Sequence, residues 1–559
     1  MSTPASRRWD QETMLVAWLA AGVSLLSFFF YLRHGELLLY GDAVAHIGIA
    51  RRVFDSRTPG LLQLGTVWLP LPHLLMIPFL ISNWMWQSGV GGSIPSLVAF
   101  VLGAVGIFRL ARGALSSSDP PGPSARSAAW AAVVIYVANP NLLYLQATAM
   151  TEALYLALFI WSVVYFAEFV RGEEGSPLLK CGLCLAAACL TRYDGWFLAA
   201  AVGIAVAVCV WRKQGAAGLL RRWFIFSLLV AAVPALWVTY NAAIYGNPLE
   251  FANGPYSAKA IERKTAVPGF PPHPGTGNLA VAASYFLKSG ELNLAAGNWG
   301  RFWLALAAIG TGLAVFGGRS HWPLLLLWVP LPFYMLSVAY GGVPIFLPVW
   351  WPHSIYNARY GLQLLPASAV FAAVVAHFLA GCTPRWQIKT SIAAAMLILA
   401  AASYAWTWGG RAICFREAWI NSRTRLALEA ELAAYLKALP PNSTILIYLG
   451  DHVGALESAG VPLRRTINEG NHRMWKRPAD PEGLWERALA NPAKYVDYVI
   501  AMNGDAVAEQ VNRSQLATLA VIHVSGQATA TIYSTGKLPT SNGRESLTLP
   551  RGPRAAFQR

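Results

Sequence analysis

"MLVAWLAAGVSLLSFFFYL", residues Met14–Leu32, decides the class of protein that this sequence encodes. The stretch carries no charged side chain, and an α-helix of about 20 apolar residues spans the hydrocarbon core of a bilayer. It is too long for the apolar region of a cleaved signal peptide, and no small-residue cleavage site follows it. We therefore expect a retained first membrane helix.

Similar apolar segments recur along the chain. Of its 559 residues, 55% are hydrophobic and 13% are charged, and the mean hydropathy is +0.43. A soluble protein carries about 25% charged residues. The pattern predicts a polytopic α-helical membrane protein with about 11 transmembrane helices, since a β-barrel would show short alternating segments instead. The expected spans are 13–32, 91–111, 128–147, 150–170, 178–191, 195–211, 222–244, 299–316, 323–340, 360–380 and 390–409.

The distribution of positive charge predicts the orientation. The net charge is +16, and most Lys and Arg residues lie in short loops that fall on one side of the expected spans. By the positive-inside rule that side is cytoplasmic, so the loops 33–90, 245–298 and 341–358 lie outside. Such charges set topology and contact anionic lipid, so we expect membrane lipid as a partner and no nucleic acid. The expected location is the cytoplasmic (inner) membrane of a bacterium.

Hydropathy drops in the C-terminal part of the chain. "TILIYLG" (Thr444–Gly450), "YVDYVIAM" (Tyr495–Met502) and "ATLAVIHVSG" (Ala517–Gly526) are typical of strands, whereas Pro481–Ala490 and Asp505–Gln515 are typical of helices. This alternation predicts a small α/β soluble domain, extracytoplasmic and hence periplasmic. The expected units are a seven-helix module over 1–244 with juxtamembrane helices in its first outer loop (33–90), a large outer loop over 245–298, four further spans over 299–410, the α/β domain over 420–540 and a flexible basic tail over 541–559.

The first outer loop opens with "YGDAVAHIGIARRVFDS", residues Tyr40–Ser56. Asp42 and His46 are four residues apart and share a face of the expected amphipathic helix, and Arg51 follows one turn later. A carboxylate here could deprotonate a hydroxyl or hold a divalent cation. Two structural alternatives stay open: Asp42 as the N-cap of this helix, and His46 as a buried histidine with one hydrogen bond. The proline-containing stretch 64–86 predicts an interfacial helix.

Ionisable residues also interrupt two later segments. "LTRYDGW" (Leu190–Trp196) contains Arg192 and Asp194, which could form a local ion pair at a tight turn or bind a phosphate through the arginine. Glu152 lies at the start of a helix, where the helix dipole alone would favour it. Ionisable residues at such places usually face a protein cavity or each other.

Two further candidates lie in later outer loops. "NARYGLQLLPA" (Asn357–Ala367) contains Arg359 and Tyr360, and this arginine could reach lipid headgroups or bind a phosphate in a cavity. Tyr256 lies in the loop 245–298, whose length is uncommon unless the loop is functional. The sequence contains no P-loop, Rossmann fingerprint, HExxH or GxSxG motif. The convergence of these features on one face predicts an outer-surface site for a phosphate-bearing, partly apolar substrate.

In this order, the motifs resemble the GT-C superfamily of membrane glycosyltransferases, which includes protein O-mannosyltransferases and the lipid A aminoarabinose transferase. The resemblance covers about residues 1–380 and is carried by "YGDAVAHIGIARR", "VWLPLPHLL", "MTEALYLALF", "LTRYDGWFL" and "NARYGLQLLPA". It implies a polyprenyl-phosphate sugar as donor, a lipid, glycan or protein as acceptor, and inverting transfer of a hexosyl or pentosyl group. It also implies that Asp42 is the base or a metal-linked carboxylate, that Arg192 is the family's basic residue after the short fifth helix, and that Arg359 faces the lipid phosphate.

The sequence departs from the family pattern at two places. Ala43 replaces a second acidic residue, and Trp68 and Leu69 stand before Pro70 where the family often has a lysine. A divalent metal therefore stays open as a cofactor, and no cofactor is certain. The expected catalytic residue is Asp42, and the expected substrate- or phosphate-binding residues are His46, Arg51, Glu152, Arg192, Asp194, Tyr256, Arg359 and Tyr360.

Three other functions remain as alternatives. A secondary transporter of a small or lipid-linked solute would also place charges within helices, but it would usually show inverted repeats, which this sequence lacks. A non-catalytic scaffold would use the α/β domain to bind a partner. A lipid-linked oligosaccharide ligase or polymerase would share the substrate class and differ only in the reaction.

Overall fold

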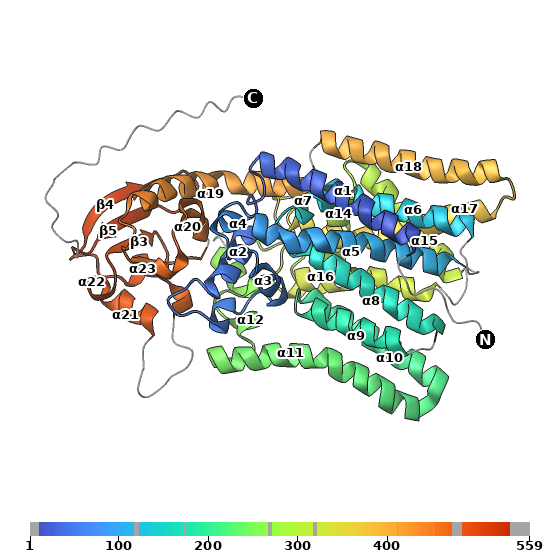
Figure 1. The fold of residues 1–559 in the computed structure, drawn as a ribbon, viewed down its shortest axis with the longest axis horizontal. Helices are drawn as coiled ribbons and strands as arrows, with labels where there is room; N and C mark the ends of the chain where they lie inside the picture. The colour runs from blue at the N-terminus through green and yellow to red at the C-terminus, as the bar shows by residue number, and fades with distance from the viewer. Residues whose placement is uncertain are drawn as a thin grey trace.

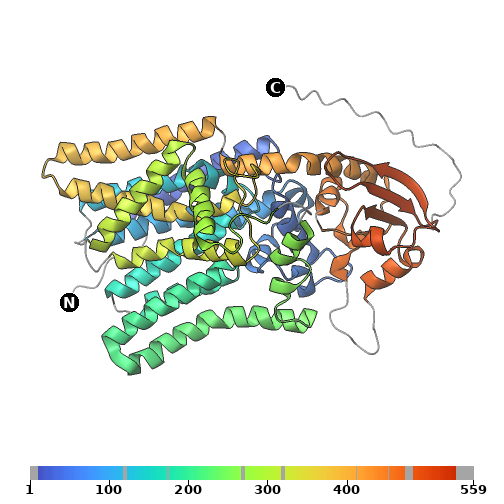
Figure 2. The ribbon, with the colours of Figure 1, turned by 180° about the vertical axis from the view of Figure 1, so that it is seen from behind.

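The computed structural model describes residues 10–116, 122–172, 175–265, 271–316, 321–410, 412–450, 452–471 and 483–536. Figure 1 shows a bundle of long helices at one end of the molecule and a small sheet at the other, joined by the long helix α19 (Ile413–Ala438). Figure 2 shows the same division from behind. The expected helical membrane bundle with a small C-terminal sheet is confirmed, while the expected tail 541–559 lies outside the described residues.

Within the described residues, nine helices are long and apolar enough to cross a membrane, or ten if one bent pair counts as a single span. About 11 spans were expected, and one of them, 178–191, corresponds to α9 (Gly175–Cys189), an apolar helix that is shorter than those counted here. The other elements of the bundle are α1 (Gln11–Arg33), α5 (Val90–Leu115), α6 (Pro123–Val137), α7 (Pro140–Gln146), α8 (Glu152–Gly172), α10 (Asp194–Gly218), α11 (Phe224–Tyr245), α15 (Asn298–Phe316), η3 (Trp322–Trp328), α16 (Pro330–Tyr340), η4 (Ala358–Leu364), α17 (Leu365–Gly381) and α18 (Trp386–Gly409).

The bent pair consists of α6 and α7, which meet at 61° where a single span over 128–147 was expected. The break follows from Asn139 and Pro140, because a residue before proline is pushed out of the helical conformation. Asn139 is extended, and its side chain accepts hydrogen bonds from the N–H groups of Asn141 and Leu142, which caps α7. The short helix α7 then leads into α8, which begins at Glu152.

Segment 33–90 folds into short helices between the bundle and the sheet (Figures 1 and 2): α2 (Gly41–Arg52), η1 (Leu61–Leu64), α3 (Leu71–Met76) and α4 (Asn83–Gln87). The N-cap of α2 is Tyr40, and Asp42 lies within the first turn, so the alternative that Asp42 caps this helix is wrong. The stretch 64–86 contains none of the candidate spans. It exposes apolar side chains, as an interfacial segment does: Leu74, Leu75, Ile81 and Trp84.

Segment 245–298 is more ordered than a large loop. It contains α12 (Glu250–Asn253), α13 (Ala258–Thr265) and α14 (Leu279–Leu294), while residues 266–270 lie outside the described part of the chain. The side chain of Asn278 caps α14 by accepting a hydrogen bond from the N–H of Val281. Helix α14 packs against α16 and η4, so part of this segment belongs to the bundle.

The C-terminal sheet has five strands in the order β2-β1-β3-β5-β4. Strands β2, β1 and β3 are parallel, and β5 runs antiparallel to both β3 and β4. The three expected strands are present, but β2 and β5 were not foreseen, and the helix expected over 505–515 ends at Gln510. The elements are β1 (Ile445–Ile447), α20 (Val453–Ala459), η5 (Leu463–Arg465), β2 (Thr466–Ile467), η6 (Glu469–Asn471), α21 (Leu484–Ala490), α22 (Pro492–Tyr495), β3 (Tyr498–Met502), α23 (Ala506–Gln510), β4 (Ala517–Ile522) and β5 (Ala530–Ser534).

The sheet domain contacts segment 33–90 through polar groups. The buried carboxylate of Asp55 accepts hydrogen bonds from the N–H groups of Leu463 and Arg464 at 3.2 and 3.3 Å. The amide of Gln63 donates to the carbonyl of Gly470 at 2.8 Å. Through these hydrogen bonds the sheet domain is held beside segment 33–90.

Candidate functional site

Arg359 is surrounded by three carboxylates that come from three distant parts of the chain. Its Nη2 donates to Asp42 of α2 at 2.5 Å, its Nε to Glu152 of α8 at 3.2 Å, and its Nη1 to Glu417 of α19 at 3.0 Å. The side chains of Glu152 and Glu417 are each 1% exposed, whereas that of Asp42 is 40% exposed. Asp42 is therefore the carboxylate of this group that a ligand can reach.

The backbone beside Arg359 is held by the same glutamate. Asn357 adopts a positive φ of 57°, and η4 begins directly after it. Glu417 accepts hydrogen bonds from the N–H groups of Asn357 at 2.9 Å and Arg359 at 3.2 Å. A carboxylate is a favourable acceptor for the unpaired N–H groups at the start of a helix. Glu417 thus fixes both the backbone and the guanidinium of Arg359.

Arg192 forms a second centre beside the first. It donates from Nε to Asp194 at 3.2 Å, from Nη1 to Glu152 at 3.3 Å, and from Nη2 to the hydroxyl of Tyr334 at 3.0 Å. The same oxygen of Asp194 also accepts from Tyr334 at 3.1 Å and from the amide of Gln363 at 2.5 Å. Glu152 bridges the two guanidiniums because its Oε1 accepts from both. We call the six charged residues of these centres the polar cluster: Asp42, Glu152, Arg192, Asp194, Arg359 and Glu417.

Tyr360 lies between the two arginines. Each guanidinium carbon is 5.1 Å from the centre of its ring. The ring of Tyr334 stacks on it with centroids 5.1 Å apart. Cations are attracted to the face of an aromatic ring, so Tyr360 stabilises the approach of two like charges.

The polar cluster has more acceptors than donors. Four carboxylates face two guanidiniums, which leaves an excess of two negative charges when all six groups are ionised. Among the described residues, three buried oxygens in and beside the polar cluster lack a hydrogen-bond donor, namely Glu152 Oε2, Asp194 Oδ1 and Gln363 Oε1. Buried acceptors without a partner cost free energy, so this region is suited to a ligand that brings hydroxyl or amine donors.

The polar cluster is not a ready-made metal site. In the described part of the chain, no group of three or more His, Cys, Asp or Glu side chains is arranged to hold a metal ion. One oxygen each of Asp42, Glu152 and Asp194 is engaged by a guanidinium. Divalent cations such as Mg²⁺ and Ca²⁺ need several free oxygen ligands. We therefore derive no step that uses a metal.

The structure brings together most, but not all, of the expected site residues. Asp42, Glu152, Arg192, Asp194, Arg359 and Tyr360 meet in and around the polar cluster. Arg51 lies elsewhere: it pairs with Asp55 at 2.9 Å and donates to the carbonyl of Leu80 and the side chain of Asn83. The hydroxyl of Tyr256 is 3.1 Å from that of Tyr448, beside the sheet domain.

His46 is buried on α2 and shares a hydrogen bond of 2.8 Å with His73 of α3. Its pKa is lowered to about 3 by burial, and the charges of Arg192 and Arg359 act in the same direction. Desolvation disfavours the charged form of a histidine. His46 is therefore uncharged at neutral pH, and the nearby arginines contribute to that state.

Sequence reasoning missed four residues that the structure places at the site: His73, Tyr334, Gln363 and Glu417. Glu417 lies in α19, between the expected spans that end at 410 and the α/β domain that was expected to start at 420, where no element was predicted. The sequence did contain a signal for Glu417, because Cys414 lies three residues before it and shares its helix face. Both residues are buried. Tyr334 and Gln363 lie within apolar spans, where uncharged polar residues are common.

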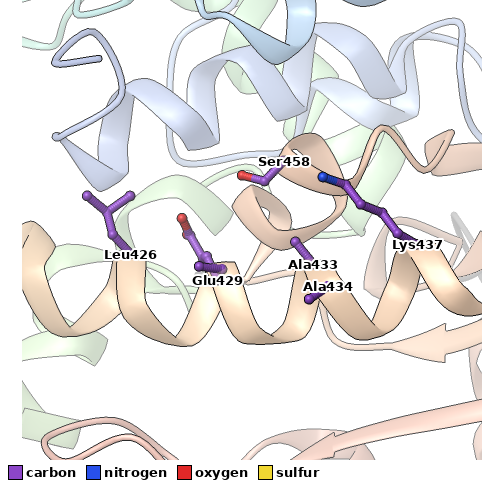
Figure 3. Close-up of a pocket in the computed structure, with 7 residues that line it drawn as sticks. Leu426, Glu429, Ala433, Ala434, Lys437 and Ser458 are labelled. Carbon is purple, nitrogen blue, oxygen red and sulfur yellow. The ribbon is translucent and has the colours of Figure 1, made fainter. Parts of the chain in front are cut away.

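A surface pocket of about 410 Å³ lies away from the polar cluster, between α19 and α20 (Figure 3). Its lining is largely small and apolar, with Glu429, Lys437 and Ser458 as polar groups. None of its lining residues belongs to the polar cluster. We therefore place the candidate site at the polar cluster and not at this pocket.

Comparisons with known proteins show where this fold recurs. No family model matches the sequence, and no curated protein sequence matches it. Among solved structures, ArnT from Cupriavidus metallidurans bound to undecaprenyl phosphate superimposes with a TM-score of 0.56 at 14% identity, covering 92% of this chain and 97% of ArnT. The apo state of the same protein gives a TM-score of 0.54 at 14% identity, with the same coverage. The chain therefore has the fold of ArnT over nearly its whole length, in agreement with the resemblance that the sequence motifs led us to expect.

Proposed function

We propose that this protein is a membrane glycosyltransferase that moves a sugar from a polyprenyl-phosphate donor to the hydroxyl of an acceptor. The observation that carries the proposal is the contact between Asp42 and Arg359, because it places a ligand-accessible carboxylate against a buried guanidinium. The fold supports the same reading, since ArnT with this fold binds undecaprenyl phosphate. A lipid, glycan or protein can serve as the acceptor.

The donor phosphate would compete with Asp42 for Arg359. All three donor groups of this guanidinium are occupied by carboxylates, and Asp42 is the one that is partly exposed. A phosphate binds guanidinium groups through two parallel hydrogen bonds. When it displaces Asp42, the freed carboxylate can act as a base, so donor binding and base activation are linked.

The proposed chemistry is a single displacement at the anomeric carbon. The acceptor hydroxyl passes its proton to Asp42, its oxygen bonds to the anomeric carbon, and the bond from that carbon to the phosphate oxygen breaks. The bonding electrons leave with polyprenyl phosphate, whose negative charge Arg192 and Arg359 stabilise. A single displacement inverts the anomeric configuration.

Other residues would position the sugar and the acceptor. The unpaired oxygens of Glu152, Asp194 and Gln363 are suited to hydroxyl or amine groups of the sugar. His46 and Tyr360 lie beside the arginines, and Tyr256 lies at the sheet domain, where an acceptor would enter. Arg51 is not part of this proposal because its donors serve the fold.

We infer that the site faces the outer side of the cytoplasmic membrane. The arginine- and lysine-rich short loops of the sequence lie at the opposite ends of the spans from Asp42 and Glu417. The sheet domain would then be periplasmic, and the lipid-linked donor would reach the site from the outer leaflet.

The test measures release of polyprenyl phosphate by purified protein with a panel of radiolabelled polyprenyl-phosphate sugars and a membrane lipid extract as acceptor. We expect turnover by the wild type and by Glu431→Gln, which changes an exposed carboxylate on α19. We expect Asp42→Asn to fold but to lose at least about 10²-fold in rate, the usual contribution of a general base.

Two results would contradict this proposal. Equal turnover by the wild type and Asp42→Asn would exclude Asp42 as the base. No turnover with any donor, combined with uptake of a solute into proteoliposomes, would favour a secondary transporter. Turnover only with lipid-linked oligosaccharides would keep the substrate class and identify a ligase or polymerase.

A further inference from the structure

His46 and His73 form a buried pair between α2 and α3. Their side chains are 4% and 0% exposed, and His46 Nδ1 is 2.8 Å from His73 Nε2. The ring of Trp68 lies 4.6 Å from that of His46. A neutral imidazole has one donor nitrogen and one acceptor nitrogen. Once the donor of the shared hydrogen bond is known, the proton positions on both rings follow.

The other nitrogen of His73 identifies the donor. His73 Nδ1 is fully buried and has no hydrogen-bond partner among the residues that the structure describes. If His46 donated the shared proton, His73 would carry its own proton on Nδ1, as a buried N–H without an acceptor. If His73 donates from Nε2, Nδ1 is an unprotonated acceptor. Buried N–H groups without partners are rarer than buried acceptors without partners, so His73 is the donor.

The tautomer of His46 follows from this assignment. Its Nδ1 accepts from His73, so its proton is on Nε2. In the described part of the chain Nε2 has no hydrogen-bond partner, yet it is not among the fully enclosed atoms. Asp42 and His46 are four residues apart on α2 and therefore share a face of this helix. His46 thus carries an N–H group that a ligand can use on a helix face that also carries Asp42.

Burial and the two arginines lower the pKa of His46 to about 3, which keeps the ring neutral at physiological pH. An imidazole in this state cannot act as a strong acid, and its accepting nitrogen is already occupied by His73. Neutral imidazoles with lowered pKa values can polarise a bound oxygen by donating a hydrogen bond.

We propose that His73 is a positioning residue that holds His46 in the neutral Nε2–H tautomer, and that His46 donates this hydrogen bond to an oxygen of the substrate bound beside Asp42. The proposal rests on the proposed glycosyl transfer for the identity of the substrate. It assigns His46 a donor role and excludes a role as proton acceptor.

The first test requires no activity. In protein labelled with ¹⁵N-histidine, the ring signals of His46 are those that disappear in His46→Gln. We expect protonated Nε2 and unprotonated Nδ1, unchanged between pH 5 and 8. In His73→Phe we expect a mixture of tautomers. A protonated Nδ1 in the wild type would overturn the proposal, whether or not sugar transfer is ever detected.

The second test uses sugar transfer. The neutral amide of His46→Gln can donate a hydrogen bond, so we expect it to retain activity within about tenfold, whereas His46→Phe should lose about 10²–10³-fold in kcat, as when an oxyanion donor is removed. His73→Gln should exceed His73→Phe in kcat, and the exposed His34→Phe is the matched control. An equal loss of kcat in His46→Gln and His46→Phe would contradict the donor role. So would an ionisation in the pH dependence of kcat that disappears in His46→Gln.

Discussion

Glu417 and Arg359 lie 58 residues apart and meet at 3.0 Å, with the glutamate also accepting the backbone N–H of the arginine. Glu417 belongs to α19, the helix that joins the bundle to the sheet domain (Figure 1). The same helix contacts segment 33–90 through Arg425, which donates to the carbonyls of Leu38 and Leu39. Helix α19, which connects the two parts of the protein, therefore also lines the candidate site.

Replacement of Glu417 should weaken both the fold and the site. Glu417→Ala leaves Arg359 with one fewer acceptor and two backbone N–H groups without a partner. Removing one partner of a buried ion pair costs about 3–5 kcal/mol. We expect a clear fall in the thermal unfolding midpoint and loss of sugar transfer, with a smaller effect in Glu417→Gln. Glu431→Ala, at an exposed position of the same helix, is the control, and an equal shift in both alanine variants would contradict this role.

The two arginines should respond differently to lysine. Arg359 uses three separate nitrogens to contact three carboxylates, a geometry that a single ammonium cannot reproduce. We expect Arg359→Lys to lose about 10²-fold or more in kcat, since small misplacements of reacting groups have effects of this size. Arg192 is 16% exposed and contacts fewer carboxylates, so Arg192→Lys should mainly raise the KM for the donor. Arg301→Lys, at a 67% exposed side chain, should leave both constants unchanged. A kcat loss in Arg192→Lys equal to that in Arg359→Lys would contradict this division.

The sequence predicted the membrane class and most of the candidate site because charge within or beside an apolar segment is a strong signal. Arg192 interrupts an apolar stretch, whereas Asp42 and Arg359 lie in outer loops next to expected spans, and each was a candidate on that ground. Their mutual contacts were not predictable, since Arg359 and Asp42 are 317 residues apart. Short apolar segments were also ambiguous: α9 resembles a span in composition and differs in length, and β2 is only two residues long.

Glu457 should make the stability of the sheet domain depend on pH. Glu457 lies in α20, and neither of its buried carboxylate oxygens has a hydrogen-bond partner in the described part of the chain. Burial raises its pKa well above 4.5, Glu429 raises it further, and Arg425 opposes the shift. The folded domain therefore favours the protonated acid. Its contribution to stability is present below about pH 4.5 and is lost as the pH rises toward the folded-state pKa.

Glu457→Gln should remove this pH dependence. At pH 8 we expect the variant to be more stable than the wild type by about 1–3 kcal/mol, the cost of a buried polar group that lacks its partner. At pH 4 the two proteins should unfold at similar temperatures. Glu509→Gln, at an exposed glutamate of the same domain, is the control. A variant that is less stable than the wild type at pH 8 would show that Glu457 has a stabilising partner as an anion.

Arg51 was expected to bind substrate, but its contacts in the structure serve the fold, and its ion pair with Asp55 allows this to be tested. Asp55 is 1% exposed, pairs with Arg51 at 2.9 Å and accepts two N–H groups of the sheet domain. Asp55→Ala should destabilise the protein by about 3–5 kcal/mol because it leaves a buried guanidinium without its charge partner.

Arg51→Met should have a related effect, and the double variant should cost less than the sum, since residues in one network are not additive. Thermal unfolding and limited proteolysis between the bundle and the sheet domain would measure both. For the folded fraction of Arg51→Met we expect an unchanged KM for the donor. A rise in KM with unchanged unfolding would contradict this prediction. Arg51 would then bind substrate, as the sequence alone suggested. The contact between segment 33–90 and the sheet domain would be held without Arg51, by Gln63 and its neighbours.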